Sequence, residues 1–239
     1  MTPTHPLATE VKVLAFDVFG TVVDWYGSIV AELQALYPEV DAPGLALAWR
    51  AGYAPAMARV ASGELPWTRV DELHRLILDT LLSQFGLDHL DDFQRRHLNR
   101  VWHRLRPWAD TVTGLTRLKT HYTITTLSNG NIGLLTHMAK RAGLPWDCIL
   151  SAETFHAYKP DPCTYLGVAR IFDLPPEHVM LVAAHEDDLI AAAACGLRTA
   201  WVDRPLEFGP PSPDVARPEG KGFDLRAHDL IDLAKQLGC

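Results

Sequence analysis

The chain has 239 residues, 48% of them hydrophobic and 21% charged, which is typical of a globular protein with one large domain or a core plus an insert. The formal net charge of −7 disfavours nucleic acid and anionic membranes as main partners. No apolar run reaches the roughly 18 residues that span a bilayer, and the first ten residues show no signal-peptide pattern. The four cysteines have no paired spacing, which indicates reduced thiols and a cytoplasmic location.

Short apolar runs alternate with helical patterns along much of the chain. Strands are predicted at residues 11–16, 122–127, 148–151, 179–184 and 198–202, and helices at about 132–142, 162–172 and 187–195. This alternation predicts an α/β fold, with a Rossmann-like parallel sheet and helices on both of its faces. Sites in such sheets lie at the C-terminal ends of the strands.

The region 25–107 breaks the alternation. Its segments have the periodicity of amphipathic helices, and no convincing strand is found there. The simplest organisation is a core formed by residues 10–24 and 108–234, with 25–107 as a helical insert placed after the first strand. The Pro/Gly-rich segment 203–222 is predicted to be either an ordered surface loop or a mobile segment.

Polar residues gather at four places where a predicted strand ends or a helix begins. In chain order they are Asp17 and Thr21, then Ser128 and Asn129, then Lys159 and Tyr165, and finally His185 with Glu186, Asp187 and Asp188. Each cluster has an ordinary structural explanation when taken alone, as a turn aspartate, a helix cap, a surface lysine or acids that favour a helix N-terminus. Their order along the chain is the informative feature.

In this order the clusters resemble the four motifs of the haloacid dehalogenase superfamily, which read here as "FDVFGT", "LSNG", "YKPDP" and "HEDDL". The resemblance covers essentially the whole chain, and the ordered set is highly specific for the superfamily. It implies a Rossmann-like core, and it implies that the insert at 25–107 is a small helical cap subdomain.

Two positions separate this chain from the magnesium-dependent phosphohydrolases that form most of the superfamily. Those enzymes have a second acid two residues after the nucleophile, where Phe19 stands here, and an aspartate of the fourth motif where Ala184 stands. A phosphate ester needs a cation to neutralise its charge and an acid to protonate the leaving group, whereas a halide leaves as a stable anion. The missing acids therefore favour a reaction at carbon, with no metal and no cofactor.

Within the insert, "LAWRAGY" places Arg50 directly after Trp49. The type II L-2-haloacid dehalogenases have a similar Trp–Arg pair, in which the arginine contacts the departing halide. A helical arginine often pairs with an acid four residues away, but Ala46 and Ala54 occupy those positions. This favours a halide-binding role over a solvated surface position.

The resemblance implies hydrolysis of short 2-haloalkanoic acids, such as haloacetate and L-2-haloacids, to 2-hydroxy acids with inversion. Asp17 would displace the halide and form an aspartyl ester, which water then hydrolyses. Lys159 would keep Asp17 ionised and stabilise the oxyanion of the second step. Thr21 and Asp188 would position Lys159 or the water.

The resemblance also assigns residues that bind the substrate. Arg50 and Asn129 would receive the halide. Ser128 and the backbone N–H groups after it would bind the substrate carboxylate. Phe19 and Tyr165 complete the substrate-binding set, and Tyr165 would act by orienting its neighbours.

His185 departs from the family pattern, because many type II enzymes have an asparagine at this position. Three interpretations stay open. The imidazole could assist the attacking water, it could tighten the pocket and so make fluoride worth testing as a leaving group, or it could be a hydrogen-bonded structural histidine.

Two other functions stay open as well. One is a phosphatase of the same superfamily with an atypical site, and the other is a catalytically inactive binding module on the same fold. Phe19 and Ala184 argue against the first. The second is disfavoured because the expected site residues are retained together, namely Asp17, Arg50, Ser128, Asn129, Lys159 and Asp188. The expected partner is a small-molecule 2-haloacid, with no nucleic acid and no membrane, and the resemblance adds a homodimer as an option.

Overall fold

The computed structural model describes residues 6–210, 220 and 222–239. Residues 1–5, which belong to the segment predicted not to be a signal peptide, lie outside the described residues. Most of the predicted loop at 203–222 also lies outside them, namely 211–219 and 221. No helix of the described part is both long and apolar enough to cross a membrane.

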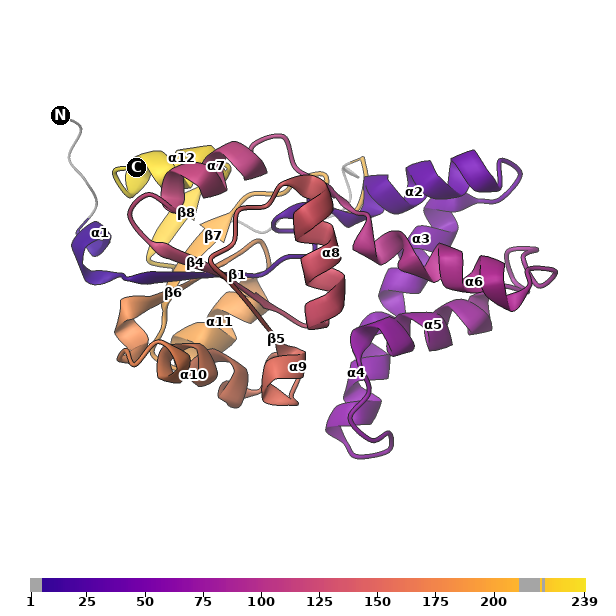
Figure 1. Ribbon diagram of the computed structural model, residues 1–239, viewed down its shortest axis with the longest axis horizontal. Helices are drawn as coiled ribbons and strands as arrows, with labels where there is room; N and C mark the ends of the chain where they lie inside the picture. Colours follow the sequence, from indigo (N-terminus) through magenta and orange to yellow (C-terminus); the bar gives the residue numbers. More distant parts are fainter. Residues whose placement is uncertain (1–5, 211–219, 221) are drawn as a thin grey trace.

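A six-stranded parallel sheet forms the centre of the core (Figure 1). In spatial order its strands are β5 (Cys148–Ser151), β4 (Thr123–Ser128), β1 (Val13–Phe16), β6 (Val179–Ala183), β7 (Arg198–Val202) and β8 (Leu225–Ala227). Every neighbouring pair is parallel, which confirms the predicted fold class. The sequence did not predict β8, because three residues are too few to show a hydrophobic period.

Helices cover both faces of this sheet (Figure 1). One face carries α7 (Thr111–Leu118), α8 (Ile132–Ala142) and α12 (Leu230–Gln236). The other face carries α10 (Pro162–Ile171) and α11 (Glu186–Ala194). The core also contains three short elements, α1 (Leu7–Glu10), α9 (Ala152–Phe155) and the 3-10 helix η2 (Pro176–His178). Successive side chains of β1 point to opposite faces, as a strand requires. Leu14 and Phe16 therefore join the apolar cluster of the first face, and Val13 and Ala15 join that of the second.

Between β1 and β4 the chain forms a helical lobe beside the core (Figure 1). The lobe contains α2 (Trp25–Leu36), α3 (Ala42–Ala51), α4 (Tyr53–Ala61), α5 (Val70–Leu81), α6 (Asp92–Asn99) and the 3-10 helix η1 (Arg100–His103). Helix α2 begins where the Asp24 carboxylate accepts a hydrogen bond of 2.7 Å from the backbone N–H of Gly27, which caps the helix. We keep the division into a core and a cap at 25–107 as a proposal.

The two connections between core and lobe run side by side as an antiparallel pair of two-residue strands, β2 (Val23–Asp24) and β3 (Arg106–Pro107). The prediction that 25–107 contains no strand is therefore wrong at its last two residues. A strand this short, with a proline in it, carries no readable period. Because of this pairing, the chain enters and leaves the lobe at one place, beside the loop that follows β1.

Aromatic side chains join the lobe to the core. Trp102 stacks on His74 with 4.0 Å between the ring centroids, and Phe19 meets Trp102 edge-on at 5.7 Å. The indole N–H of Trp49 donates to the backbone carbonyl of His74 at 2.8 Å. Phe19, in the loop after β1, is thus packed against the helical lobe, which gives its apolar character a structural reason.

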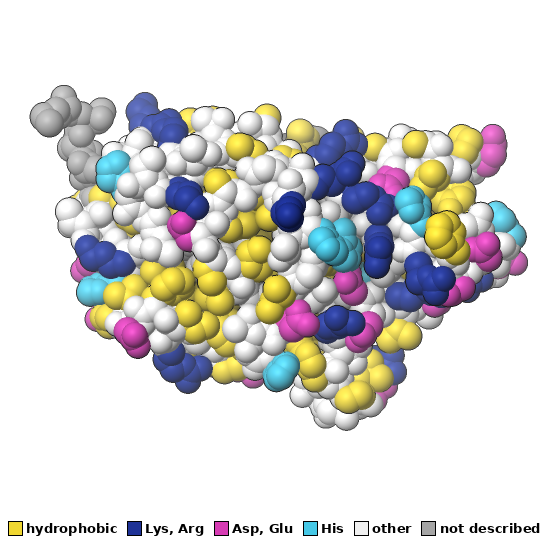
Figure 2. Space-filling model, viewed as in Figure 1, with side chains coloured by type: hydrophobic (Ala, Val, Ile, Leu, Met, Phe, Trp, Pro, Cys, Tyr) yellow, Lys and Arg dark blue, Asp and Glu magenta, His cyan; other side chains and the backbone are white. Residues whose placement is uncertain are grey.

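Charges of both signs occur on the surface. On the face shown in Figure 2, Lys and Arg side chains gather over the junction between α8 and the helical lobe, with Asp, Glu and His side chains among them. The net charge of −7 is therefore not spread evenly over the molecule. The expected lack of nucleic-acid and membrane partners stays a prediction.

Gly114 lies where α7 packs against α12. A Cβ atom at this position would come within 2.5 Å of the Leu230 Cβ and 2.6 Å of the Leu230 carbonyl carbon. We expect Gly114→Ala to lower the free energy of unfolding by about 1–3 kcal/mol, although alanine normally favours a helix over glycine by about 0.5–1 kcal/mol. Urea unfolding followed by circular dichroism measures the difference.

Gly133→Ala in α8 is the matched control, because a Cβ atom there would meet only the Asn131 Nδ2, at 3.9 Å. This variant should be as stable as the wild type or slightly more stable. Equal effects of the two substitutions would contradict the close packing of α7 against α12.

Candidate active site

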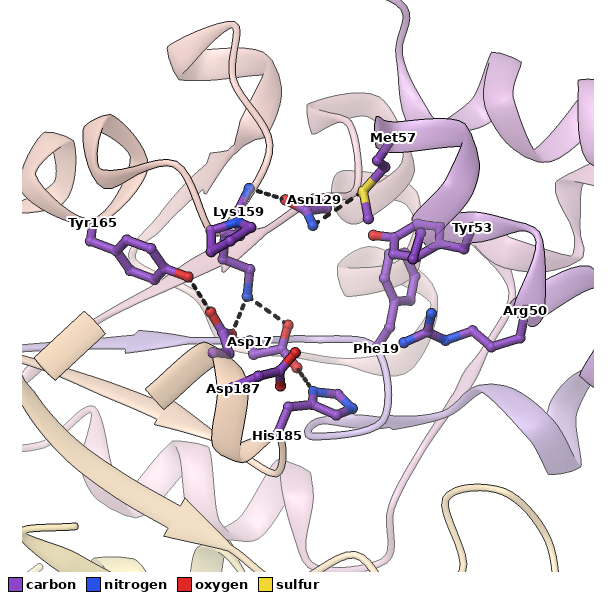
Figure 3. A pocket seen from close by; sticks show the side chains of 13 residues that line it. Asp17, Phe19, Arg50, Tyr53, Met57, Asn129, Lys159, Tyr165, His185 and Asp187 are labelled. Atoms are coloured by element: carbon purple, nitrogen blue, oxygen red, sulfur yellow. Dashed lines mark hydrogen bonds and ion pairs between the residues drawn. The ribbon is translucent and has the colours of Figure 1, made fainter. Parts of the chain in front are cut away.

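A cavity of about 330 Å³ lies at the C-terminal ends of the central strands, between the core and the helical lobe (Figure 3). The core lines it with Asp17, Phe19, Asn129, Lys159, Pro160, Tyr165, His185, Asp187 and Asp188, and the lobe lines it with Arg50, Tyr53, Ala54 and Met57. The residues from the core follow β1, β4 and β6 or belong to α10, α11 and the loop before α10. Parallel strands bring these separated motifs to one edge of the sheet, as the sequence predicted.

Asp17 is the central group of the cavity. Its Oδ1 accepts a hydrogen bond of 2.9 Å from Lys159 Nζ, and its Oδ2 lies 2.8 Å from Thr21 Oγ1 and 3.1 Å from His185 Nδ1. Burial alone raises the pKa of this carboxyl, but the neighbouring positive charges of Lys159 and His185 and their hydrogen bonds outweigh burial and hold the pKa well below its ordinary value. Asp17 is therefore a carboxylate at neutral pH.

Lys159 lies between two carboxylates. Its Nζ donates to Asp17 and also to Asp188 Oδ2, at 2.5 Å. The other oxygen of Asp188 accepts from the hydroxyl of Tyr165 at 2.6 Å. Burial by itself lowers the pKa of Lys159, but the two carboxylates raise it above its ordinary value. The structure therefore connects Tyr165 and Asp188 to Asp17 through Lys159.

Thr21 lies behind Asp17 and links it to the end of β6. Its hydroxyl donates to Asp17 Oδ2 and accepts a hydrogen bond of 2.9 Å from the backbone N–H of Ala184. Thr21 is fully buried. Its contacts fix the orientation of the Asp17 carboxylate, so that Thr21 acts on Asp17 without lining the cavity.

His185 lies between two acids. Nδ1 faces Asp17, and Nε2 lies 2.9 Å from Glu207 Oε1. Burial alone lowers the pKa of His185, but its hydrogen bonds to Asp17 and Glu207 and the charges of both acids raise the pKa to about 10. The imidazole is therefore a cation at neutral pH.

Arg50 extends from α3 toward the same cavity, opposite Asp17 and His185 (Figure 3). Its guanidinium carbon lies 4.7 Å from the centre of the Tyr53 ring and 5.9 Å from that of Trp25. The Nε atom is buried without a hydrogen-bond partner, and no acid pairs with Arg50 among the described residues. A buried donor group of this kind is suited to bind an anion.

Ser128 is the last residue of β4 and Asn129 follows it, but the two side chains differ in their surroundings. The Asn129 Oδ1 accepts a hydrogen bond of 2.8 Å from the backbone N–H of Lys159, and Nδ2 lies 3.4 Å from Met57 Sδ. The Ser128 hydroxyl instead accepts from the N–H of Gly130 at 3.1 Å, and Ser128 is not among the residues that line the cavity. The role of Ser128 in binding a substrate carboxylate stays a prediction.

Sequence reasoning missed several residues of the site. Tyr53 and Met57 line the cavity, and their spacing of three and seven residues from Arg50 was a helical-face signal that could have found them. Glu207 lies in the Pro/Gly-rich segment, where no motif or period indicates a site. Trp25, whose indole N–H donates to Glu207 Oε1 at 3.1 Å, carried no signal beyond its apolar character.

The donor set does not fit a magnesium site. Asp17 and Asp188, the two acids of the family motifs, are both hydrogen-bonded to Lys159 Nζ. The side chain of Phe19 is only 6% exposed and packs against Trp102. Within the described ranges, no group of three or more His, Cys, Asp or Glu side chains is arranged to hold a metal ion.

A family model described as haloacid dehalogenase-like hydrolase matches residues 11–196. The chain belongs to this family. The sequence resemblance is thus confirmed.

Individual relatives have names that specify a reaction, which the description of the family model does not. The solved L-2-haloacid dehalogenase PA0810 is 49% identical, with 95% of this chain and 99% of that chain covered and a TM-score of 0.89. The defluorinating L-2-haloacid dehalogenase Rha0230 is 44% identical, with both chains fully covered (100%) and a TM-score of 0.90. An (S)-2-haloacid dehalogenase of Pseudomonas putida is 24% identical over 199 residues, which are 82% of this chain and 86% of the relative.

The pKa of His185 gives a direct test of the charged cluster. With a pKa of about 10, against an ordinary value of about 6.5, the imidazole should stay protonated at about pH 8 in the substrate-free protein. Its proton stabilises the folded state fully below the ordinary pKa, and this contribution is lost as the pH rises toward 10. NMR titration of the isotopically labelled imidazole nitrogens measures the midpoint, and Glu207→Gln should lower it. A midpoint near the ordinary value in the wild type would contradict the two-acid environment.

Proposed function

We propose that the protein is a hydrolytic L-2-haloacid dehalogenase that converts short 2-haloalkanoic acids, including haloacetate, to 2-hydroxy acids. The observation that carries this proposal is the Asp17 carboxylate, held ionised by Lys159 and facing a cavity that also contains Arg50, a cation that pairs with no acid in the described part of the chain. The names of the two relatives at 44% and 49% identity support the same substrate class.

In the first step, Asp17 attacks the α-carbon of the substrate from the side opposite the halogen. The carbon–halogen bond breaks as the new carbon–oxygen bond forms, so the configuration at this carbon inverts. Arg50 receives the departing halide, and the rings of Tyr53 and Phe19 provide apolar walls beside it. A halide needs no proton as it leaves, which agrees with the apolar residue at position 19.

In the second step, water attacks the carbonyl carbon of the Asp17 ester. The oxyanion that forms is stabilised by Lys159 Nζ and by the hydroxyl of Thr21, which already contact the two carboxylate oxygens. Asp188 and Tyr165 hold Lys159 in place. The acyl–oxygen bond then breaks, and the 2-hydroxy acid is released.

We also propose that the helical lobe at 25–107 acts as a cap. It contributes Arg50, Tyr53 and Met57 to the cavity, so the substrate site is complete only when the lobe is packed on the core. A homodimer, a cytoplasmic location, and the lack of nucleic-acid and membrane partners remain predictions from the sequence.

The two rival functions have less support. A phosphatase would need an acid for its leaving group, and Phe19 and Ala184 stand where the family's phosphohydrolases have acids. An inactive binding module would not need Asp17, Lys159 and Asp188 in one hydrogen-bonded cluster.

Halide release tests the proposed reaction. We expect the wild type to release halide from chloroacetate and from L-2-chloropropionate but not from the D enantiomer, because Asp17 and Arg50 stand on opposite sides of the cavity and would let backside attack reach only one enantiomer whose carboxylate is held in place. The rates should be equal in the presence and absence of EDTA. Asp17→Asn should abolish release. If the protein instead releases phosphate from a generic phosphate ester, and EDTA abolishes this release, the phosphatase is supported. If it releases neither halide nor phosphate, the binding module is supported.

Arg50 can be tested separately. We expect Arg50→Gln to lower kcat/KM for halide release by roughly 10²–10³-fold, because removal of a charge-stabilising donor typically has an effect of this size. Arg59→Gln is the matched control, since Arg59 belongs to the same lobe but is half exposed and pairs with Glu64. Steady-state kinetics on chloroacetate measures kcat/KM for both variants. If kcat/KM is the same in Arg50→Gln as in Arg59→Gln, Arg50 does not bind the halide.

A further inference from the structure

Glu207 is a buried acid beside the loop that carries Asp17. It is only 5% exposed, and its carboxylate fills the space next to Gly20. A Cβ atom at Gly20 would lie 2.2 Å from Glu207 Oε1, and Gly20 has a φ of +87°. Glycine at this position therefore allows both the turn after Asp17 and the close approach of Glu207.

Two donors from different parts of the chain hold the Glu207 carboxylate. Oε1 lies 3.1 Å from the indole Nε1 of Trp25 and 2.9 Å from His185 Nε2. The next residue, Phe208, packs edge-on against Trp25, with 5.5 Å between ring centroids. A buried carboxylate is unfavourable unless it is paired, and its charged partner here is His185.

Asp17, His185 and Glu207 thus form a continuous chain of hydrogen bonds. One imidazole nitrogen faces the proposed nucleophile, and the other faces a carboxylate that lies outside the lining of the cavity. An acid that binds the far nitrogen of a histidine fixes its ring and tautomer and stabilises the imidazolium that forms during proton transfer.

We propose that Glu207 is a positioning residue that keeps a proton on His185 Nε2, so that Nδ1 accepts the proton of the water that attacks the Asp17 ester. The inference rests on the proposed function, because it concerns the second step of that reaction. It assigns a role to an acid that none of the four sequence motifs contains.

When Asp17 becomes a neutral ester, His185 loses its Nδ1 proton to solvent and keeps the Nε2 proton, which Glu207 holds. As the water oxygen bonds to the carbonyl carbon of Asp17, one water proton moves to Nδ1. The acyl–oxygen bond then breaks, the alkoxide takes that proton from Nδ1, and the product leaves as the 2-hydroxy acid. The remaining carboxylic-acid proton on Asp17 returns to Nδ1, which restores the starting state.

The other polar groups near the ester are engaged in contacts of their own. Lys159 Nζ donates to two carboxylates, and both oxygens of Asp188 accept hydrogen bonds, one from Lys159 and one from Tyr165. Asp187 is the rival base, since it lines the cavity and is exposed. The charged groups that face His185 or share its cavity are Asp17, Glu207, Lys159, Asp187, Asp188 and Arg50.

Glu207→Gln separates the two steps. The amide keeps the size of the side chain and an oxygen for Trp25 but removes the charge that stabilises the imidazolium. In rapid-quench experiments with chloroacetate, we expect a burst of about one halide per site at nearly the wild-type rate, followed by turnover slowed by roughly 10²-fold or more. Mass spectrometry should show the accumulated ester on Asp17.

The pH profile gives a readout that a merely structural role would not move. Loss of the Glu207 charge lowers the pKa of His185, so the inflection in the ester-hydrolysis rate should shift to lower pH in Glu207→Gln. Glu207→Asp, which keeps the charge, should retain the ester-hydrolysis inflection nearer the wild-type pH. It also serves as the second variant if the glutamine variant does not fold.

Glu186→Gln is the matched control. The substitution removes one negative charge from the residue next to His185. In the wild type, the Glu186 carboxylate accepts a hydrogen bond from the backbone N–H of Gly220 and does not line the cavity. Its burst and turnover should match the wild type.

Three results would overturn the proposal. Equal slowing of burst and turnover in Glu207→Gln, with an unchanged pH profile, would make Glu207 a structural residue. Ester accumulation in Asp187→Asn but not in Glu207→Gln would assign the base to Asp187. The absence of halide release by the wild type would reject the proposed function itself, a result distinct from the first two because it concerns the unsubstituted enzyme.

Discussion

The buried ion pair between Asp17 and Lys159 is the contact on which the rest of the site depends. The two side chains are 10% and 8% exposed, and their charged atoms are 2.9 Å apart. Removing one partner of such a pair typically destabilises a protein by about 3–5 kcal/mol, because the other charge is left buried and unpaired. The pair joins the loop after β1 to the loop before α10. Lys159 therefore has two effects through one contact. It keeps Asp17 ionised, and it ties the loop after the central strand β1 to the loop before α10.

Lys159 also accounts for the departure from phosphate chemistry. The chain itself places a cation between Asp17 and Asp188, in a family whose phosphohydrolases use a metal ion beside their acids. Phe19, at the position of their proton donor, packs between the core and the helical lobe. A positive charge that keeps the nucleophile ionised, together with an apolar wall, suits a leaving group that departs as a stable anion.

Much of the core was predictable because buried parallel strands read as apolar runs, and the strands at 148–151 and 198–202 were placed correctly. The motifs at their ends were predictable as one site because parallel strands end at one edge. Glu207 was not, since its partners Trp25 and His185 are 182 and 22 residues away and its segment has no period. The orientation of Ser128 depends on a local turn to Gly130, which composition does not reveal.

A single turnover in water enriched in the heavy oxygen isotope, with enzyme in excess over chloroacetate, tests the central claim most directly. If Asp17 is the nucleophile, the isotope enters the Asp17 carboxylate, because water attacks its carbonyl carbon, and the first product molecule carries an unlabelled oxygen from Asp17. Mass spectrometry of the product and of the peptide that contains Asp17 measures both. Labelled product with an unlabelled Asp17 would contradict the account, because it would mean that water attacks the substrate carbon directly.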